Sequence, residues 1–249
     1  MPHFHRCLHR DTLSRMPVSP QGFQQRSDRL MGDLVEQGRR VQGIVERAFD
    51  CLFTRDEGKA TECGKLDDVI DAADVEIEKA AVQLLTDAAS AGAAMDAQQV
   101  RLLLTIAKVN NELERIADVA VDLAALVPNA CKQGRAYPDT FRVIANSVVG
   151  ILRDTVNALR LNDWKLAKVV LQSQHTVTAF HDAILKDAEQ QIAQGKMTVE
   201  FAFQLHEVAN QSEVLADHCT NIAEQVIYLT TGAIVRHTET GWAGLTRFG

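Results

Sequence analysis

Apolar side chains recur at steps of three and four residues along six long stretches of the chain, the period of an amphipathic helix. In the second stretch, for example, Leu66, Ile70, Ala73 and Ile77 belong to one apolar stripe. No stretch of useful length alternates polar and apolar residues as a strand does. The pattern therefore predicts an all-α fold with six long helices, at about residues 21–53, 59–89, 96–126, 139–161, 164–194 and 198–231.

The prolines divide these helices into two groups of three. The chain has five prolines, at positions 2, 17, 20, 128 and 138. Proline disrupts helix interiors and so collects at helix boundaries. The two proline-free blocks, 21–127 and 139–249, are therefore expected to be two helical halves joined near residues 128–138.

The two halves also resemble each other in sequence. Residues 52–56 align with 159–163 at an offset of 107, and residues 111–118 align with 210–217 at an offset of 99. The order is kept, and the difference of eight residues is expected in a longer turn around residues 90–94. This predicts two tandem three-helix bundles, an internal pseudo-repeat that packs on one continuous core.

The segments expected from this division are an N-terminal extension over 1–21, a first three-helix repeat over 22–127, a second over 138–237 and a C-terminal tail over 238–249. The extension lacks the apolar core of a secretory signal. It is expected to be flexible. An amphipathic anchor, or a translation start at Met16 or Met31, are the alternatives.

The composition of the chain limits the kinds of binding partner and the cellular compartments that are expected for the protein. The 249 residues have a formal net charge of −7 and no basic stripe, which argues against nucleic-acid binding and against strong attraction to anionic lipid. No apolar run approaches the ~18 residues of a membrane-spanning helix, so any membrane association would be peripheral. The five cysteines show no C-x-x-C spacing, which favours a reducing, cytoplasmic location.

Two rows of acidic residues are the strongest candidates for chemistry. Glu114, Asp118 and Asp122 follow one another at steps of four on the third predicted helix, and Asp67 and Asp71 do so on the second. Like charges so placed destabilise a helix unless something compensates them. Antiparallel packing would bring Asp67 and Asp71 opposite Glu114 and Asp118, forming an oxygen-rich site for iron, manganese or magnesium.

A solvated acidic face is the alternative, and spacing alone favours it. The repeat strengthens the metal hypothesis, because Glu213 and Asp217 reproduce Glu114 and Asp118.

Catalytic motifs are absent from the sequence. No H-E-x-x-H occurs and no histidine follows a glutamate by three residues, which argues against zinc peptidases and ferritin-like oxidases. The glycine-lysine pairs near residues 58–65 do not have the spacing of a phosphate loop. Surface or packing roles are more frequent than ligand roles for histidines such as His175, His181, His206 and His218 in the second half.

Several of these segments together resemble one protein family. Residues 113–118, Leu-Glu-Arg-Ile-Ala-Asp, resemble the L-E-R-I-G/A-D signature of the PhoU family of bacterial phosphate-uptake regulators, and residues 216–224 resemble its second copy. Residues 231–237 resemble the G-x-x-x-R-H ending of many members, and residues 65–71 resemble the D-x-x-x-D segment of the first repeat. The likeness extends over about residues 22–237.

The resemblance implies two pseudo-symmetric three-helix bundles whose paired E/D-x-x-x-D motifs hold multinuclear iron or zinc clusters, one per repeat. It implies a regulator rather than an enzyme, acting in the cytoplasm at the inner membrane face and self-associating as a homodimer. Its implied partners are the ATPase of the phosphate ABC transporter and a sensor histidine kinase. Through them it would exert negative regulation on the phosphate-starvation response.

The second repeat departs from this pattern. Gln174 and Thr178 stand where the first repeat has Asp67 and Asp71, and Asn221 replaces Asp122. The first-repeat site is therefore expected to bind metal better. The second is expected to be degenerate, or to be completed in part by His175 or His181.

The functional hypothesis is thus a PhoU-like regulator of phosphate uptake that docks on the transporter and the kinase. Three alternatives remain at this point. They are a PhoU-like accessory of a different transporter, a carboxylate-bridged metalloenzyme, and a helical adaptor without metal.

Overall fold

A computed structural model describes residues 19–92, 94–133 and 136–236. Its helices are α1 (Pro20–Thr54), α2 (Glu57–Ser90), α3 (Ala97–Ala125), α4 (Val127–Gln133), α5 (Asp139–Leu161), α6 (Trp164–Ala193) and α7 (Val199–Thr231). The all-α prediction is confirmed, and the six long helices lie within a few residues of their predicted bounds. Of the predicted terminal segments, residues 1–18 and 238–249 lie outside the described residues, whereas residues 20 and 21 already belong to α1.

The short helix α4 was not predicted. The residues after position 126 were expected to form an irregular connection because they include Pro128 and Asn129. Pro128 is the second residue of α4, where the missing N–H is tolerated because the first turn of a helix has no intrahelical acceptor for it. Val127 and Ala130 are buried, so packing holds this turn in place.

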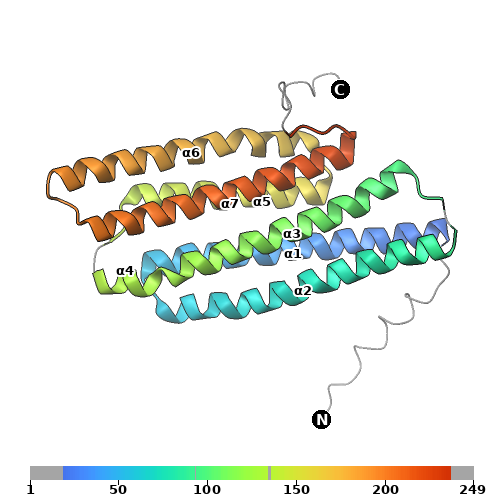
Figure 1. Ribbon diagram of the computed structural model, residues 1–249, viewed down its shortest axis with the longest axis horizontal. Coiled ribbons are helices and arrows are strands. Elements are labelled where there is room, and N and C mark those ends of the chain that lie inside the picture. Colours follow the sequence, from blue (N-terminus) through green and yellow to red (C-terminus); the bar gives the residue numbers. More distant parts are fainter. Residues whose placement is uncertain (1–18, 93, 134–135, 237–249) are drawn as a thin grey trace, which may run out of the picture.

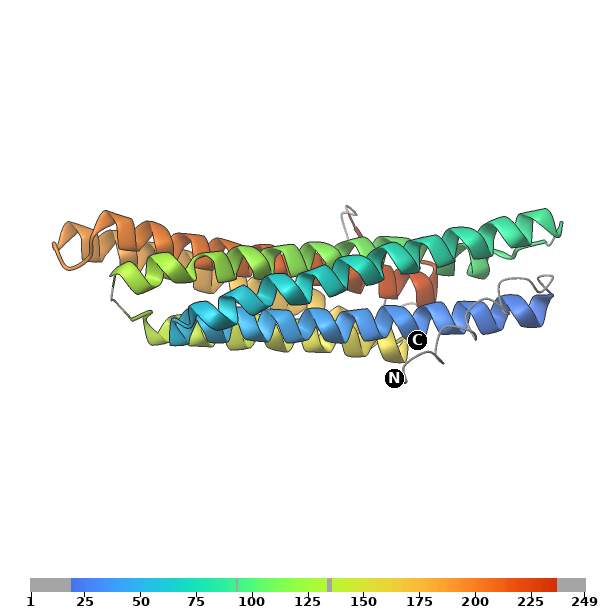
Figure 2. The ribbon, with the colours of Figure 1, turned by 90° about the horizontal axis from the view of Figure 1, so that it is seen from below.

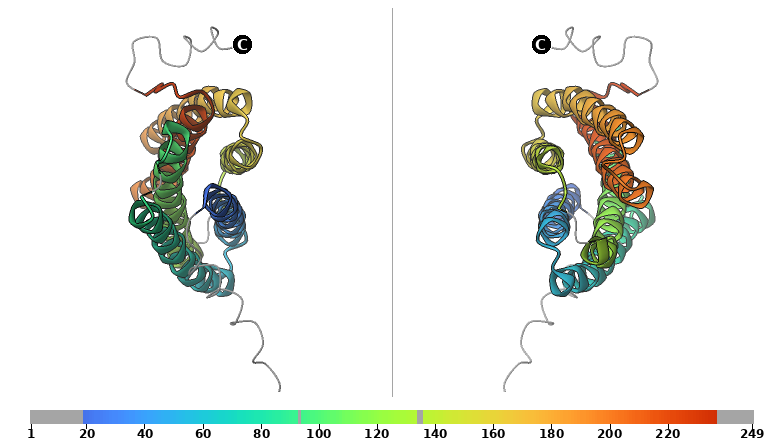
Figure 3. Two further views of the ribbon diagram at one scale, coloured as in Figure 1. Left: turned by 90° about the vertical axis from the view of Figure 1, so that its right-hand side faces the viewer. Right: turned by 90° about the vertical axis from the view of Figure 1, so that its left-hand side faces the viewer.

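The six long helices form two layers (Figures 1 and 2). Seen along the long axis of the molecule, α6, α7, α3 and α2 form a curved row, and α1 and α5 lie side by side against one face of it (Figure 3). The first bundle is α1, α2 and α3 and the second is α5, α6 and α7. Contacts of α3 with α7 and of α1 with α5 join the bundles, which confirms the predicted tandem arrangement with a continuous core.

The first turn of each bundle shows the duplication at the level of the backbone. Arg55 and Asn162 end α1 and α5 in the left-handed conformation, with φ of 56° and 50°. Asp56 and Asp163 follow them and cap α2 and α6 by accepting hydrogen bonds from backbone N–H groups of the first helical turn. These residues are the aligned pairs of the predicted repeat, so the same turn is built twice.

The second turn of each bundle corrects one expectation. The eight extra residues of the first repeat do not form a longer turn around residues 90–94. By the repeat alignment, α2 continues four residues beyond the end of α6, α3 begins three residues before α7, and the connection is one residue longer. The excess is therefore mostly helical, and the α2–α3 hairpin is extended by about one turn at each helix.

A close approach of α1 and α5 contributes to the join between the bundles. A Cβ atom added at Gly38 on α1 would lie 3.0 Å from Val156 Cγ2 on α5, so a larger residue there would require the Val156 side chain or the helices to shift. At one end, rings of Phe53, Tyr137 and Phe141 pack in sequence, and the Tyr137 hydroxyl accepts a hydrogen bond of 2.9 Å from Gln204. In the described ranges, no helix is both long and apolar enough to cross a membrane.

Candidate metal centre

Two pairs of carboxylates meet at the seam between α2 and α3. Asp67 and Asp71 lie one turn apart on α2, and Glu114 and Asp118 lie one turn apart on α3. We call these four residues the first-repeat cluster. Asp67 and Glu114 are half-buried, whereas Asp71 and Asp118 are exposed. The structure thus brings together the four residues that helical spacing predicted.

Buried apolar residues on α2 and α3 determine the direction in which the acidic residues of these helices face. Ile70 on α2 and Leu113, Ile116 and Ala117 on α3 are almost completely buried. The backbone carbonyl of Ile70 also accepts a hydrogen bond of 2.7 Å from the buried amide of Gln37 on α1. Because apolar positions on both helices face α1 and the core, the acidic positions between them are left at the edge of the seam.

The electrostatics of the cluster are those of an uncompensated group of negative charges. Burial and the charges of Asp71, Asp118 and Asp68 raise the pKa of Asp67 to about 6 from an ordinary 3.8. Burial and neighbouring carboxylates, led by Asp118, also raise the pKa of Glu114. One oxygen of Asp67, Oδ1, is buried and has no hydrogen-bond partner. A bound cation would offset this repulsion and supply the missing partner.

A fifth carboxylate extends the cluster. Asp74 lies two turns from Asp67 on α2 and accepts a hydrogen bond of 2.6 Å from Asn110 Nδ2. Burial and the charges of Glu78 and Asp71 raise its pKa, and the bond from Asn110 only partly opposes this. The separation of seven residues from Asp67 was the sequence signal for this neighbour, but Asp74 was not among the predicted ligands.

Asp122, which was predicted as part of the same row, does not join the cluster. It is exposed one turn beyond Asp118, and it is not among the charges that raise the pKa of Asp67 or Glu114. Arg115 partly opposes the rise in the pKa of Glu114, whereas Arg26 and Lys59 pair elsewhere, with Asp87 and Asp50.

Within the described ranges, no group of three or more Asp, Glu, His or Cys side chains is arranged so that it could hold a metal ion as it stands. The chemistry of the donor set suits a hard cation, but the carboxylates of the first-repeat cluster would have to move closer together to bind one, with water or bridging oxygen supplying the rest of the coordination.

At the corresponding positions of the second bundle, uncharged side chains donate hydrogen bonds to carboxylates instead. Thr178 Oγ1 donates to Glu213 Oε1 at 2.8 Å, and Gln174 Nε2 donates to Asp217 Oδ1. We call these four residues the second-repeat cluster. In the second repeat, two uncharged side chains thus stand where the first repeat has carboxylates. Each of them donates a hydrogen bond to one of the two carboxylates that remain. Each of these carboxylates has a donor in place of a second carboxylate, although burial and the charge of Glu213 still raise the pKa of Asp217.

The two histidines proposed to complete the second site behave differently. His181 lies on α6 with Nδ1 3.4 Å from Glu213 Oε2, whereas His175 is exposed on the same helix. The structure therefore brings His181, but not His175, to the second-repeat cluster.

A polar contact between the bundles lies close to both clusters and was missed by sequence reasoning. His218 Nδ1 on α7 lies 2.7 Å from Glu112 Oε2 on α3, and Asn221 Nδ2 donates to the same oxygen at 3.0 Å. Burial alone would raise the pKa of Glu112, but the bonds from His218 and Asn221 outweigh it and lower the pKa. His218 is thus a packing residue, and its partner is on the other bundle.

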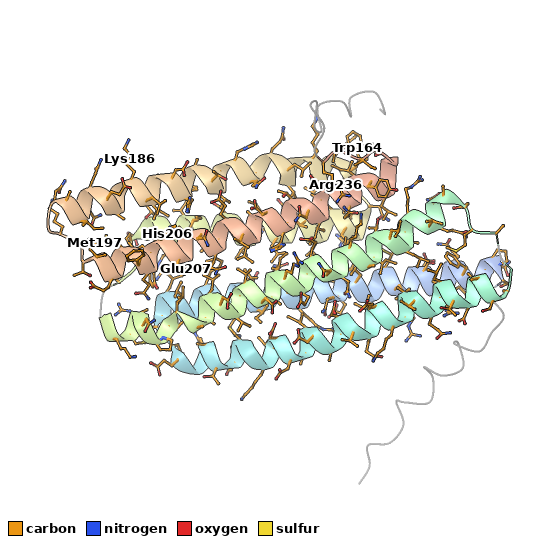
Figure 4. The ribbon with its side chains drawn as sticks, in the orientation of Figure 1. Trp164, Lys186, Met197, His206, Glu207 and Arg236 are labelled. Atoms are coloured by element: carbon orange, nitrogen blue, oxygen red, sulfur yellow. The ribbon has the colours of Figure 1, made fainter. Side chains whose placement is uncertain are left out.

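This contact borders an open cavity of about 480 Å³, whose lining includes Lys108, Asn111, Gln225 and Arg236. Arg236 lies just beyond the end of α7 (Figure 4). Gly232 ends that helix with φ of 75°, a conformation that glycine adopts without strain. The glycine and arginine of the G-x-x-x-R ending therefore have structural roles, since the glycine turns the chain and the arginine reaches the junction of the bundles.

The raised pKa of Asp67 predicts a pH-dependent stability. A carboxyl whose pKa is higher in the folded state contributes stability that is full below pH 3.8 and is lost as the pH rises through about 6. Asp67→Asn should therefore make the metal-free protein more stable above pH 6, by about 1 kcal/mol after allowance for solvent screening, and the gain should vanish near pH 4. Urea unfolding with a chelator at both pH values measures this. Asp122→Asn is the control, and an equal gain for it would contradict the assignment.

Comparisons with known proteins agree with this architecture. A family model described as the PhoU domain matches twice, over residues 34–127 and 141–226. The chain is 28% identical over 243 residues to the phosphate-specific transport system accessory protein PhoU homolog of Pseudomonas aeruginosa, covering 96% of this chain and 95% of that protein. It is 27% identical over 220 residues to the homolog of the same description from Pseudomonas putida, covering 87% and 84%.

Two solved structures are similar to the whole bundle pair. The crystal structure of PhoU from Pseudomonas aeruginosa superposes with a TM-score of 0.79 at 25% identity, covering 85% of this chain and 100% of that one. The phosphate transport system regulatory protein PhoU from Streptococcus pneumoniae superposes with a TM-score of 0.78 at 20% identity, covering 86% and 99%, which is a likeness of fold alone.

Proposed function

The chain belongs to the PhoU family, and we propose on that basis that it regulates phosphate uptake and represses the phosphate-starvation response. The family's relatives are accessory proteins of the phosphate-specific transport system, and this chain is an accessory protein of the same kind. The observation that carries the proposal is the double PhoU-domain match, which spans more than half of the chain in two consecutive repeats.

The proposed mechanism is docking rather than catalysis. The protein binds the ATPase of the phosphate ABC transporter and a sensor histidine kinase, in the cytoplasm at the membrane face, and acts as a homodimer. The two-layer fold supports this role because α2, α3, α6 and α7 form one long continuous row of helices. A row of this kind offers an extended surface to a partner.

The proposed metal centre is the first-repeat cluster. Iron or zinc, bound through Asp67, Asp71, Glu114 and Asp118, would neutralise the negative charge of the α2–α3 seam. The buried unpartnered oxygen of Asp67 and its raised pKa support this assignment. The ion would act through surface charge and through linking α2 to α3. The second-repeat cluster, with its two neutral donors, would bind metal weakly.

Deletion of the gene in its host tests the regulatory role. With phosphate plentiful, alkaline phosphatase or another phosphate-starvation reporter should be expressed constitutively in the deletion strain, and the full chain supplied in trans should restore repression. Normal repression in the deletion strain would contradict the proposal. If the uptake of another ion changed at the same time, a different transporter would be the partner.

A further inference from the structure

Two histidine side chains lie against each other across the α6–α7 seam of the second bundle. His181 belongs to α6 and His206 to α7, and their ring centroids are 5.8 Å apart with an interplanar angle of 43°. Figure 4 shows His206 on the part of α7 that runs beside α6. Both residues are only partly accessible to solvent. His181 also lies beside Glu213 of the second-repeat cluster, whereas His206 is not part of either carboxylate cluster.

Each ring presents a nitrogen atom that has nothing to bind. His181 Nε2 and His206 Nδ1 are buried and have no hydrogen-bond partner. A buried polar atom without a partner is costly, and native proteins rarely retain one without a reason. Two such atoms on rings in mutual contact point to a shared ligand that accepts two nitrogen donors.

The other nitrogen of His181 lies near two carboxylates, that of Glu213 and, at 3.6 Å, that of Asp182. Its Nδ1 lies 3.4 Å from Glu213 Oε2, and the second oxygen of Glu213 accepts a hydrogen bond of 2.8 Å from Thr178. A carboxylate beside one imidazole nitrogen keeps the proton there and leaves the lone pair on the opposite nitrogen. The unpartnered Nε2 is therefore the nitrogen that is ready to bind a metal ion.

The spacing of the rings also fits. With zinc–nitrogen bonds of about 2.0–2.1 Å, two imidazoles on one tetrahedral ion have their ring centres roughly 5–6 Å apart. We propose that His181 and His206 form a two-imidazole site for a borderline divalent ion, of which zinc, nickel and copper are the typical members. This site is distinct from the carboxylate centre, because its donors are nitrogen atoms and it joins α6 to α7.

The two histidines supply only two of the ligands that such an ion takes. In the described part of the chain, no third His, Cys, Asp or Glu side chain joins the pair as a closed set. The site is therefore expected to exchange its ion readily, unlike a structural zinc site with four protein ligands. Bound metal would link α6 to α7 and stabilise the second bundle.

Copper binding to the metal-free full chain tests the proposal directly. His3, His5 and His9 should first be replaced by glutamine, because histidines near the N-terminus also bind copper. With one equivalent of Cu²⁺, the paramagnetic resonance spectrum should show hyperfine coupling from two imidazole nitrogens. A spectrum with oxygen ligands alone would overturn the proposal, and this measurement needs no change at the site itself.

Matched variants then assign the ligands. His181→Gln and His206→Gln should each weaken Zn²⁺ and Ni²⁺ binding at least about tenfold by titration calorimetry. His175→Gln, on the exposed part of the same helix, should bind as the parent does. Circular dichroism establishes that each variant is folded. Unchanged affinity in both site variants, or an equal loss in His175→Gln, would overturn the assignment.

Discussion

Replacing Glu114 and Asp118 together by alanine is expected to remove most of the iron or zinc that the purified protein carries. The change takes away both oxygen donors of α3 and leaves Asp67 and Asp71, which lie on one helix and cannot enclose an ion by themselves. Metal per chain, measured by plasma mass spectrometry after purification from medium with iron and zinc, should fall from a substoichiometric value to near background. The metal-free variant should remain folded, because the change removes like-charge repulsion.

Two controls distinguish this centre from a general acidic surface. Asp122→Ala should keep its metal, because Asp122 lies on the same row of α3 but outside the first-repeat cluster. Glu213→Ala with Asp217→Ala should also lose little, because those carboxylates already bond to Thr178 and Gln174. Unchanged metal content in Glu114→Ala/Asp118→Ala would refute the centre.

The long helices were predictable because each has a buried stripe that repeats with the helical period. On α2, for instance, Ile70, Ile77 and Leu84 are almost completely buried at steps of seven residues. Helix α4 could not be predicted in this way, because its seven residues are too few to show a period and include a proline. Its position depends on packing against α1, α2 and α3, and such tertiary contacts leave no local signal in the sequence.

The length of the α2–α3 hairpin shows a second limit. The repeat alignment correctly placed eight additional residues near positions 90–94, but small residues such as Ala88 and Ala89 are compatible with both helix and turn. Ala88 is completely buried in the extended hairpin, so tertiary contact decides that these residues continue the helix. The repeat alignment therefore predicted the number of additional residues but not their conformation.

The candidate sites also differ in how far the sequence alone could predict them. The first-repeat cluster was open to prediction because a spacing of four residues places each acidic pair on one helix face and antiparallel packing of neighbouring helices allows the two pairs to face each other. The Glu112–His218 contact joins two different bundles, and the pairing of His181 with His206 depends on the register of α6 against α7. Neither spacing along the chain nor the repeat indicates such contacts.

The asymmetry between the repeats suggests that a metal site can be restored by two substitutions. Gln174→Asp with Thr178→Asp should add metal to the second bundle, because it places two carboxylates opposite Glu213 and Asp217 and recreates the composition of the first-repeat cluster. Metal content per chain should rise toward twice the parent value under identical loading. Combined with Glu114→Ala/Asp118→Ala, the substitutions should restore binding to a chain that has lost it.

The matched control is Gln174→Asn with Thr178→Asn, which has side chains of the same size and no charge. Without metal, the aspartate variant should be less stable than the asparagine variant at pH 7.5 by about 1–2 kcal/mol, since it replaces hydrogen bonds by repulsion. The difference should disappear as the pH falls toward 4, because carboxyls whose pKa is raised in the folded state become protonated. Added Zn²⁺ should reverse it at pH 7.5, since only the charged cluster binds the ion and binding stabilises the folded state. Equal metal content in the two variants would show that four carboxylates across this seam do not suffice for a site, and would weaken the case for the first-repeat cluster as well.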